Sequence, residues 1–147
     1  MTRILVDTGP VVAFLNRRDH HHGWVTETLG TLEPPLLTCE SVLSEACFLL
    51  REVDQGPEAV LALVARKIVL PAFPLQDEAA AVAKLMKKYA DVPMALADAC
   101  LVRMTELHRD SAVLTLDADF RIYRRNRREA IPIIAPEGLG GSGEAGR

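Results

Sequence analysis

Residues 3 to 15 read RILVDTGPVVAFL, and they predict how the chain begins to fold. The aliphatic run at 3–6 is typical of a short strand that is buried on both faces. A tight turn follows, and Pro10 suits the first turn of a helix formed by the apolar residues after it. The stretch therefore predicts a strand, a turn and a helix, with Asp7 at the point where the strand ends.

The rest of the chain repeats this alternation of strand and helix. Further strands are expected at 36–39, 67–73, 112–116 and 131–134. Helices are expected at 24–32, 42–53, 58–66 and 82–89, and from Pro93 through Asp98. Such alternation favours a single-domain three-layer α/β/α sandwich with a central, mainly parallel sheet. Ligands of such sheets bind beyond the carboxyl ends of the strands, where Asp7 and Asp117 stand.

Length and composition limit the class of protein. The chain has 147 residues, and we expect one domain over 1–136 followed by a flexible polar tail over 137–147. Hydrophobic residues make up 49% and charged residues 25%, which excludes a disordered chain. The formal net charge of -3 predicts neither a nucleic-acid binder nor a membrane binder, so any such function has to rest on local clusters.

Cysteine use and hydropathy favour a cytoplasmic location. The three cysteines form no CxxC pair and lie in apolar contexts, so we expect reduced thiols in a reducing compartment. The N-terminal residues do not resemble a signal peptide, and no apolar stretch is long enough to cross a bilayer. We therefore expect a cytoplasmic protein that does not bind membranes.

Four acidic residues stand where the local pattern does not favour a charge. Asp98 lies in MALADACLV and Glu45 in SVLSEACFLL, and each has mostly apolar neighbours one helical turn away. Neither has a lysine or arginine on its own helical face, and Asp7 and Asp117 end two expected strands. A single buried acid is as readily explained by an arginine or by backbone donors, but four acids that converge without bases need a cation.

The donor set of these acids indicates which cation they would bind. Carboxylate oxygens without histidine or cysteine favour a hard divalent ion, Mg²⁺ or Mn²⁺, over zinc. Such an ion polarises a phosphoryl oxygen and lowers the pKa of water. The residues alone therefore indicate a metal-dependent hydrolase of phosphodiesters or phosphomonoesters.

Four segments of the chain carry a resemblance to a known family: ILVDTGPVVAFLNRRDHHH, TCESVLSEACFLL, KYADVPMALADACLV and VLTLDADFRIYRR. In this order and spacing they resemble the PIN-domain nucleases, in particular the VapC-like toxins. The resemblance implies a Mg²⁺- or Mn²⁺-dependent endoribonuclease that acts on RNA as the toxin of a type II toxin–antitoxin pair. It also implies a homodimer that a small antitoxin protein neutralises.

The resemblance also assigns site residues. The family's metal-binding acids fall on Asp7, Glu45, Asp98 and Asp117. Asp119 matches a further acid of many members, which either binds the metal or caps the following turn. Thr8 and Thr115 match hydroxyls that hydrogen-bond water on the metal or a carboxylate. One departure is Ala95, where many close relatives carry another acid.

Two charged runs have less specific interpretations. In RIYRRNRR, a helical face would carry Arg121, Arg124, Arg125 and Arg128. These arginines, Arg121, Arg124 and Arg125 above all, either bind RNA phosphates or form a solvated loop or an antitoxin contact. The histidine run at 20–22 is expected to be a surface loop, because Mg²⁺ sites favour oxygen ligands.

Two other functions remain open from the sequence. One is a catalytically inactive PIN-like interaction module, against which the retention of all four acids argues. The other is an aspartate-based phosphatase, but Asp7-Thr8-Gly9 lacks the second acid of a DxD motif.

Overall fold

The computed structural model describes residues 1–139, so most of the expected tail, residues 140–147, lies outside the described residues. The strands are β1 (Arg3–Val6), β2 (Leu36–Thr38), β3 (Val69–Pro71), β4 (Ser111–Leu114), β5 (Arg124–Arg125), β6 (Glu129–Ala130) and β7 (Ile133–Ile134). The helices are α1 (Thr8–Leu15), α2 (His22–Leu29), α3 (Glu40–Leu49), α4 (Gly56–Ala65), α5 (Leu75–Lys88), α6 (Leu96–Leu107) and the short 3₁₀ helix η1 (Ala118–Arg121). None of these helices is both long and apolar enough to span a membrane.

Five strands form one parallel sheet in the order β3-β2-β1-β4-β7. Leu5 of β1 pairs with Leu37 of β2 on one side and with Val113 of β4 on the other. The strand order therefore reverses at β1 and β4, and the chain leaves both strands toward the same edge. In sheets of this kind a crevice forms at this point of reversal.

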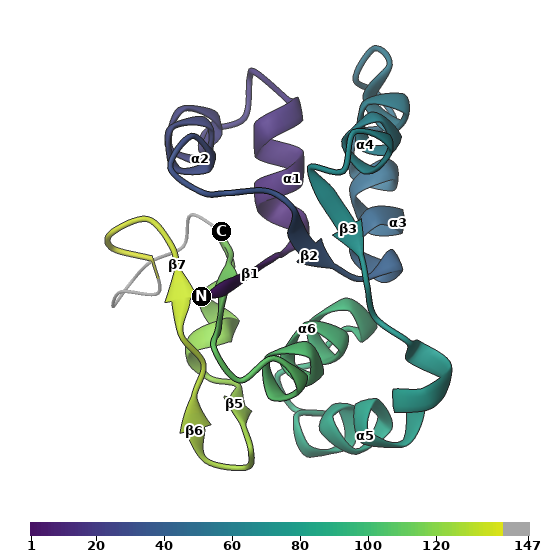
Figure 1. The fold of residues 1–147 in the computed structure, drawn as a ribbon, viewed down its shortest axis with the longest axis vertical. Coiled ribbons are helices and arrows are strands. Elements are labelled where there is room, and N and C mark those ends of the chain that lie inside the picture. The colour runs from purple at the N-terminus through teal and green to yellow at the C-terminus, as the bar shows by residue number, and fades with distance from the viewer. Residues whose placement is uncertain (140–147) are drawn as a thin grey trace.

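Helices cover both faces of the sheet, with α5 and α6 on one side and α1, α3 and α4 on the other (Figure 1). Alternate residues of a strand point to opposite faces. Leu5 and Val113 accordingly belong to the core cluster that includes α6, whereas Val6 and Leu114 belong to the cluster with α1 and α4. The expected three-layer α/β/α sandwich with a parallel sheet is confirmed.

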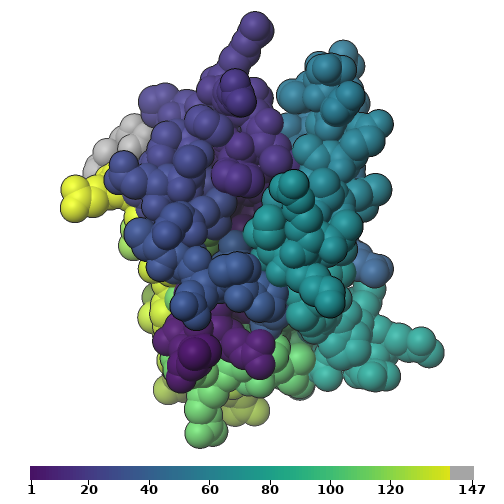
Figure 2. Space-filling model, turned by 45° about the horizontal axis from the view of Figure 1, so that its top comes forward, coloured from purple at the N-terminus to yellow at the C-terminus, as the bar shows by residue number. Residues whose placement is uncertain are grey.

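The N-terminus is anchored at the opposite edge of the sheet from the carboxyl ends of β1 and β4. Figure 2 shows the first residues, in purple, against a green segment of the chain. The Thr2 hydroxyl donates to Asp110 at 2.9 Å, and the terminal amine lies 3.6 Å from the same carboxylate. These contacts join the start of β1 to the start of β4.

Several element boundaries differ from the sequence expectations. α3 ends at Leu49 instead of residue 53, and the segment that follows adopts a left-handed conformation at Gln55, with φ of 56°. α6 begins at Leu96, three residues after Pro93. The expected helical face over the arginine run is wrong, because this run forms η1 and the antiparallel β5–β6 hairpin. Two-residue strands with the sequences RR and EA are too short to show a hydrophobic periodicity.

Gly56 allows the turn between α3 and α4 to close. A Cβ added to this residue would overlap the Leu50 carbonyl oxygen and lie 2.9 Å from the Leu50 Cβ, and Leu50 is completely buried. We expect Gly56→Ala to lower the free energy of unfolding by about 2 to 3 kcal/mol, measured by urea denaturation. Gly23→Ala is the control, because no atom lies within 4 Å of its added Cβ and alanine favours the helix. Equal stability of Gly56→Ala and the native protein would contradict the packing described.

Candidate active site

A pocket of about 650 Å³ lies at the edge of the sheet where β1 and β4 end. Six carboxylates line it, namely those of Asp7, Asp19, Glu45, Asp98, Asp117 and Asp119. The four acids singled out in the sequence thus come together from β1, α3, α6 and the segment after β4. Among residues 1–139, no lysine or arginine lines it. The pocket is therefore strongly acidic.

Asp7 is the most deeply buried of these acids, with 5% of its surface exposed. Its Oδ1 accepts the backbone N–H of Thr8 at 2.7 Å, so the carboxylate also caps the N-terminus of α1. Its Oδ2 accepts the hydroxyl of Thr115 at 2.8 Å. Two donors from different strand ends therefore fix the orientation of this carboxylate.

The Thr115 hydroxyl also orients Asp117. It accepts the backbone N–H of Asp117 at 2.9 Å while it donates to Asp7. Asp117 in turn accepts the backbone N–H of Asp119 at 2.9 Å and caps η1. The completely buried Thr115 thus connects the two acids that follow β1 and β4.

Asp98 lies in the first turn of α6 and is partly exposed. Its Oδ2 accepts the hydroxyl of Tyr123 at 3.0 Å and, more weakly, the backbone N–H of Ala95 at 3.4 Å. Burial and the nearby charge of Asp98 raise the pKa of Tyr123, so its hydroxyl stays protonated and can donate at neutral pH. The apolar neighbours Leu101 and Val102 are completely buried and pack α6 into the molecule.

Glu45 differs from the sequence expectation. It was expected against a largely apolar helix face, but its side chain is exposed and lines the pocket. Within residues 1–139, Asp7, Glu45 and Asp98 form no ion pair with a lysine, arginine or histidine.

Burial and neighbouring charges raise the pKa of Asp7 and of Asp98. Burial, with smaller contributions from the charges of Asp98 and Asp117, raises the pKa of Asp7 from 3.8 to about 7. Burial likewise raises the pKa of Asp98 to about 6, and the charges of Asp117 and Glu45 add to this effect. A bound cation would relieve both the burial cost and the repulsion.

The donor chemistry of the pocket fits a hard divalent ion. Its ligands would be carboxylate oxygens, and the buried Thr8 hydroxyl, which also lines the pocket, has no hydrogen-bond partner in the part of the chain that the structure describes. In the described part of the chain, no three acidic, histidine or cysteine side chains could hold an ion by themselves. An ion here would therefore keep several waters, as Mg²⁺ usually does.

Tyr123 was not expected from the sequence to be a site residue. We expect Tyr123→Phe to lower the rate of the reaction at this site about tenfold, because Asp98 loses the donor that orients it. Tyr89→Phe is the control, since it removes a hydroxyl from the neighbouring ring, 5.1 Å away, that bonds to Arg124 and not to an acid. Equal activity of Tyr123→Phe and Tyr89→Phe would show that the Tyr123 hydroxyl does not position Asp98.

The basic residues expected to bind RNA do not line the acid pocket. Arg125 is 6% exposed; its guanidinium binds Glu129 at 2.7 Å and the carbonyl of Thr105 at 3.2 Å, so it fastens the β5–β6 hairpin to α6. Arg124 donates to the carbonyl of Arg121 at 2.8 Å, and Arg121 donates to the carbonyl of Leu139 at 3.0 Å. Arg125 is thus a structural residue.

The histidine run is divided among three environments. His21 lines the pocket together with Asp19, which accepts its backbone N–H at 2.9 Å. His22 bonds to the carbonyl of Ala13 at 2.8 Å, and His20 is exposed. Sequence reasoning missed Asp19 and His21 as pocket residues, because a loop has no periodicity that predicts where its side chains point. The only signal for Asp19 in the sequence is that it is a further acid close to Asp7 along the chain.

The fold and the pocket define a doubly wound α/β protein with clustered acids at the reversal point of its sheet. The sequence model of the PIN domain matches residues 4–126. The chain belongs to the PIN domain family.

Two relatives from Mycobacterium tuberculosis were found. Ribonuclease VapC26 is 28% identical over 118 residues, which cover 78% of this chain and 86% of that protein. The crystal structure of VapC20, described as a Sarcin-Ricin loop cleaving toxin, matches with a TM-score of 0.64 at 20% identity and covers 75% of this chain and 86% of that one. The likeness to VapC20 concerns the fold alone.

Proposed function

We propose that this chain is a metal-dependent endoribonuclease and the toxin of a type II toxin–antitoxin pair. The observation that carries the proposal is the pocket in which six carboxylates meet and which no lysine or arginine of the described residues lines. Its place at the reversal point of the sheet, membership of the PIN family and the ribonuclease relative support it.

In this proposal Asp7, Asp98 and Asp117 hold a Mg²⁺ or Mn²⁺ ion, and Glu45 either binds it or orients water. The ion supplies charge stabilisation at the scissile phosphate and activation of water. The role of the protein is to hold the acids in place through Thr115 and Tyr123. Asp119, whose N–H bonds to Asp117, is a further candidate ligand.

A partner protein would bind beside the pocket. Phe48 and Leu49 at the end of α3 and Leu61 on α4 are large apolar side chains that are 60%, 51% and 60% exposed. Leu49 also lines the acid pocket. An exposed apolar surface next to a charged site supports contact with an antitoxin or a second copy of the chain.

Incubation of the purified protein with structured RNA and with a chromogenic phosphate monoester tests the proposal. We expect Mg²⁺ or Mn²⁺ to promote RNA cleavage, EDTA to abolish it, and the monoester to stay intact. Hydrolysis of the monoester with intact RNA would favour an aspartate-based phosphatase. Hydrolysis of neither would favour the inactive interaction module.

A further inference from the structure

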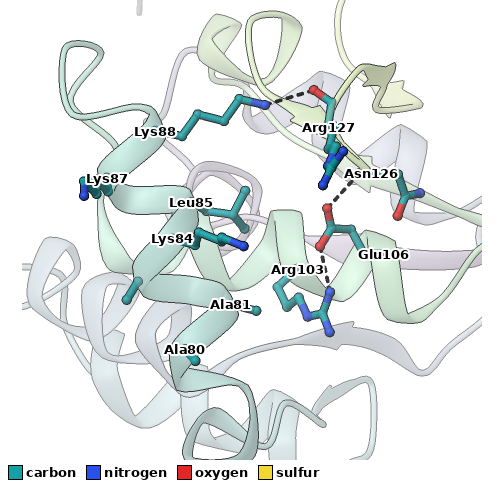
Figure 3. A pocket seen from close by; sticks show the side chains of 11 residues that line it. Ala80, Ala81, Lys84, Leu85, Lys87, Lys88, Arg103, Glu106, Asn126 and Arg127 are labelled. Atoms are coloured by element: carbon teal, nitrogen blue, oxygen red, sulfur yellow. Dashed lines mark hydrogen bonds and ion pairs between the residues drawn. The ribbon is translucent and has the colours of Figure 1, made fainter.

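A second hollow of about 840 Å³ lies between α5, the C-terminal half of α6 and the turn of the β5–β6 hairpin (Figure 3). Of the described residues, none lines both this hollow and the acid pocket. Five of its lining residues are basic: Lys84, Lys87, Lys88, Arg103 and Arg127. We call this hollow the basic groove.

Most of the positive charge in the basic groove is not neutralised. Arg103 forms ion pairs with Glu78 at 2.7 Å and with Glu106 at 2.9 Å. Glu106 also accepts the backbone N–H of Asn126 at 2.7 Å. Within residues 1–139, the three lysines and Arg127 form no ion pair. Because the whole chain carries a net charge of -3, this positive charge is a local feature.

The side chains are arranged around an open space. In Figure 3, Lys88 on α5 extends toward the hairpin, Lys84 extends across the space toward α6, and Arg127 extends from the hairpin toward α6, whereas Lys87 points away from this space. The Lys88 ammonium donates to the carbonyl of Arg127 at 2.9 Å, a neutral acceptor that leaves its charge available. The small side chains of Ala80 and Ala81 leave room on the α5 side.

Two aromatic rings connect the basic groove to the acid pocket. Tyr89 follows Lys88 directly, and its ring lies 5.1 Å from the ring of Tyr123. The Tyr123 hydroxyl donates to Asp98. Both rings are buried, so they lie in the protein interior between the end of α5 and Asp98.

We propose that the basic groove binds the phosphate backbone of RNA outside the acid pocket. This inference rests on the proposed ribonuclease function, which places the scissile phosphodiester at the acids. Cations from α5 and from the hairpin around an open groove suit a chain of phosphates, because a lysine ammonium binds phosphate as a point charge without demanding one geometry. RNA is favoured over an acidic peptide because the proposed function already requires this chain to bind RNA.

The test uses two matched double variants of the full chain. Lys84→Gln with Arg127→Asn removes two charges from the groove, and asparagine tolerates the left-handed backbone of Arg127, with φ of 76°. Arg66→Gln with Lys67→Asn is the control at the end of α4, where Lys67 has φ of 62°. All four side chains are exposed, and thermal denaturation checks that both variants fold.

RNA binding is measured in EDTA, where the acids repel phosphates and the remaining affinity reports on basic surfaces. The probe is a single-stranded RNA of about 16 nucleotides, and polyglutamate of equal charge is the comparison. We expect the groove variant to bind RNA roughly fivefold more weakly than the control variant. The slope of log affinity against log salt should fall by about 1 to 1.5.

Each other outcome has a defined meaning. Equal RNA affinity of the two variants overturns the inference, and if Mg²⁺-dependent cleavage persists, the proposed function stands. If the groove variant loses polyglutamate binding but keeps its RNA affinity, the groove is an acidic-peptide site and the inference is also overturned. If the native protein neither binds nor cleaves RNA, the proposed function fails together with the groove.

Discussion

Asp98→Asn lowers the rate of Mg²⁺-dependent RNA cleavage by about 10² to 10³-fold in our account. Asparagine keeps the shape of the side chain and an oxygen that can accept the Tyr123 hydroxyl. It removes the negative charge that faces Asp117 and Glu45. The expected loss therefore comes from weaker ion binding and not from unfolding.

The control for this variant is Asp91→Asn, an exposed acid that does not line the pocket. Both variants are compared in single-turnover RNA cleavage and in thermal denaturation with EDTA. Asp98→Asn should unfold at the same temperature as the native protein or slightly higher. If it cleaves RNA as fast as Asp91→Asn, the assignment of Asp98 is wrong.

Asp7→Asn changes how stability depends on pH in the metal-free protein. The folded-state pKa of Asp7 is raised from 3.8 to about 7, mainly by burial. Below about pH 4, Asp7 is neutral in the folded and the unfolded chain, and its burial does not lower the free energy of unfolding. As the pH rises to about 7, this free energy falls, because Asp7 ionises more readily in the unfolded chain than in the folded one. The difference between the two pKa values corresponds to a loss of up to about 4 kcal/mol in the free energy of unfolding.

Asparagine at position 7 stays neutral at every pH, but its amide cannot accept from both Thr8 and Thr115, which costs about 1 kcal/mol. We expect Asp7→Asn to be less stable than the native protein at pH 4 and more stable by about 2 kcal/mol or more at pH 8, in EDTA. Denaturation at a series of pH values measures this crossing. Parallel pH profiles of the two proteins would contradict the burial of a charged Asp7 in the pocket.

The parallel sheet could be predicted because its strands carry local signals. RILV before Asp7 and SAVL at 111–114 are aliphatic runs with turn residues at their ends, and both are central strands. The order in which the strands alternate with helices then limits the topology to a doubly wound sheet. Asp7 and Asp117 could be placed together by this argument alone.

Other features depend on tertiary contacts that leave no local pattern. Glu45 has apolar neighbours in the sequence, but it is exposed because the pocket opens at its helix. The contact of Tyr123 with Asp98 spans 25 residues, and the basic groove combines α5 with a hairpin of charged residues. Such pairings follow from packing, which neither periodicity nor residue type encodes.

Calorimetric titration of the metal-free protein with Mn²⁺ tests most directly whether the four acids form one ion-binding site. We predict that the native protein and Asp91→Asn bind Mn²⁺ with the same affinity. Asp7→Asn, Glu45→Gln, Asp98→Asn and Asp117→Asn should each weaken binding, by about tenfold or more for the three aspartates. Equal binding by all of these proteins, or no binding by the native chain, would contradict the account.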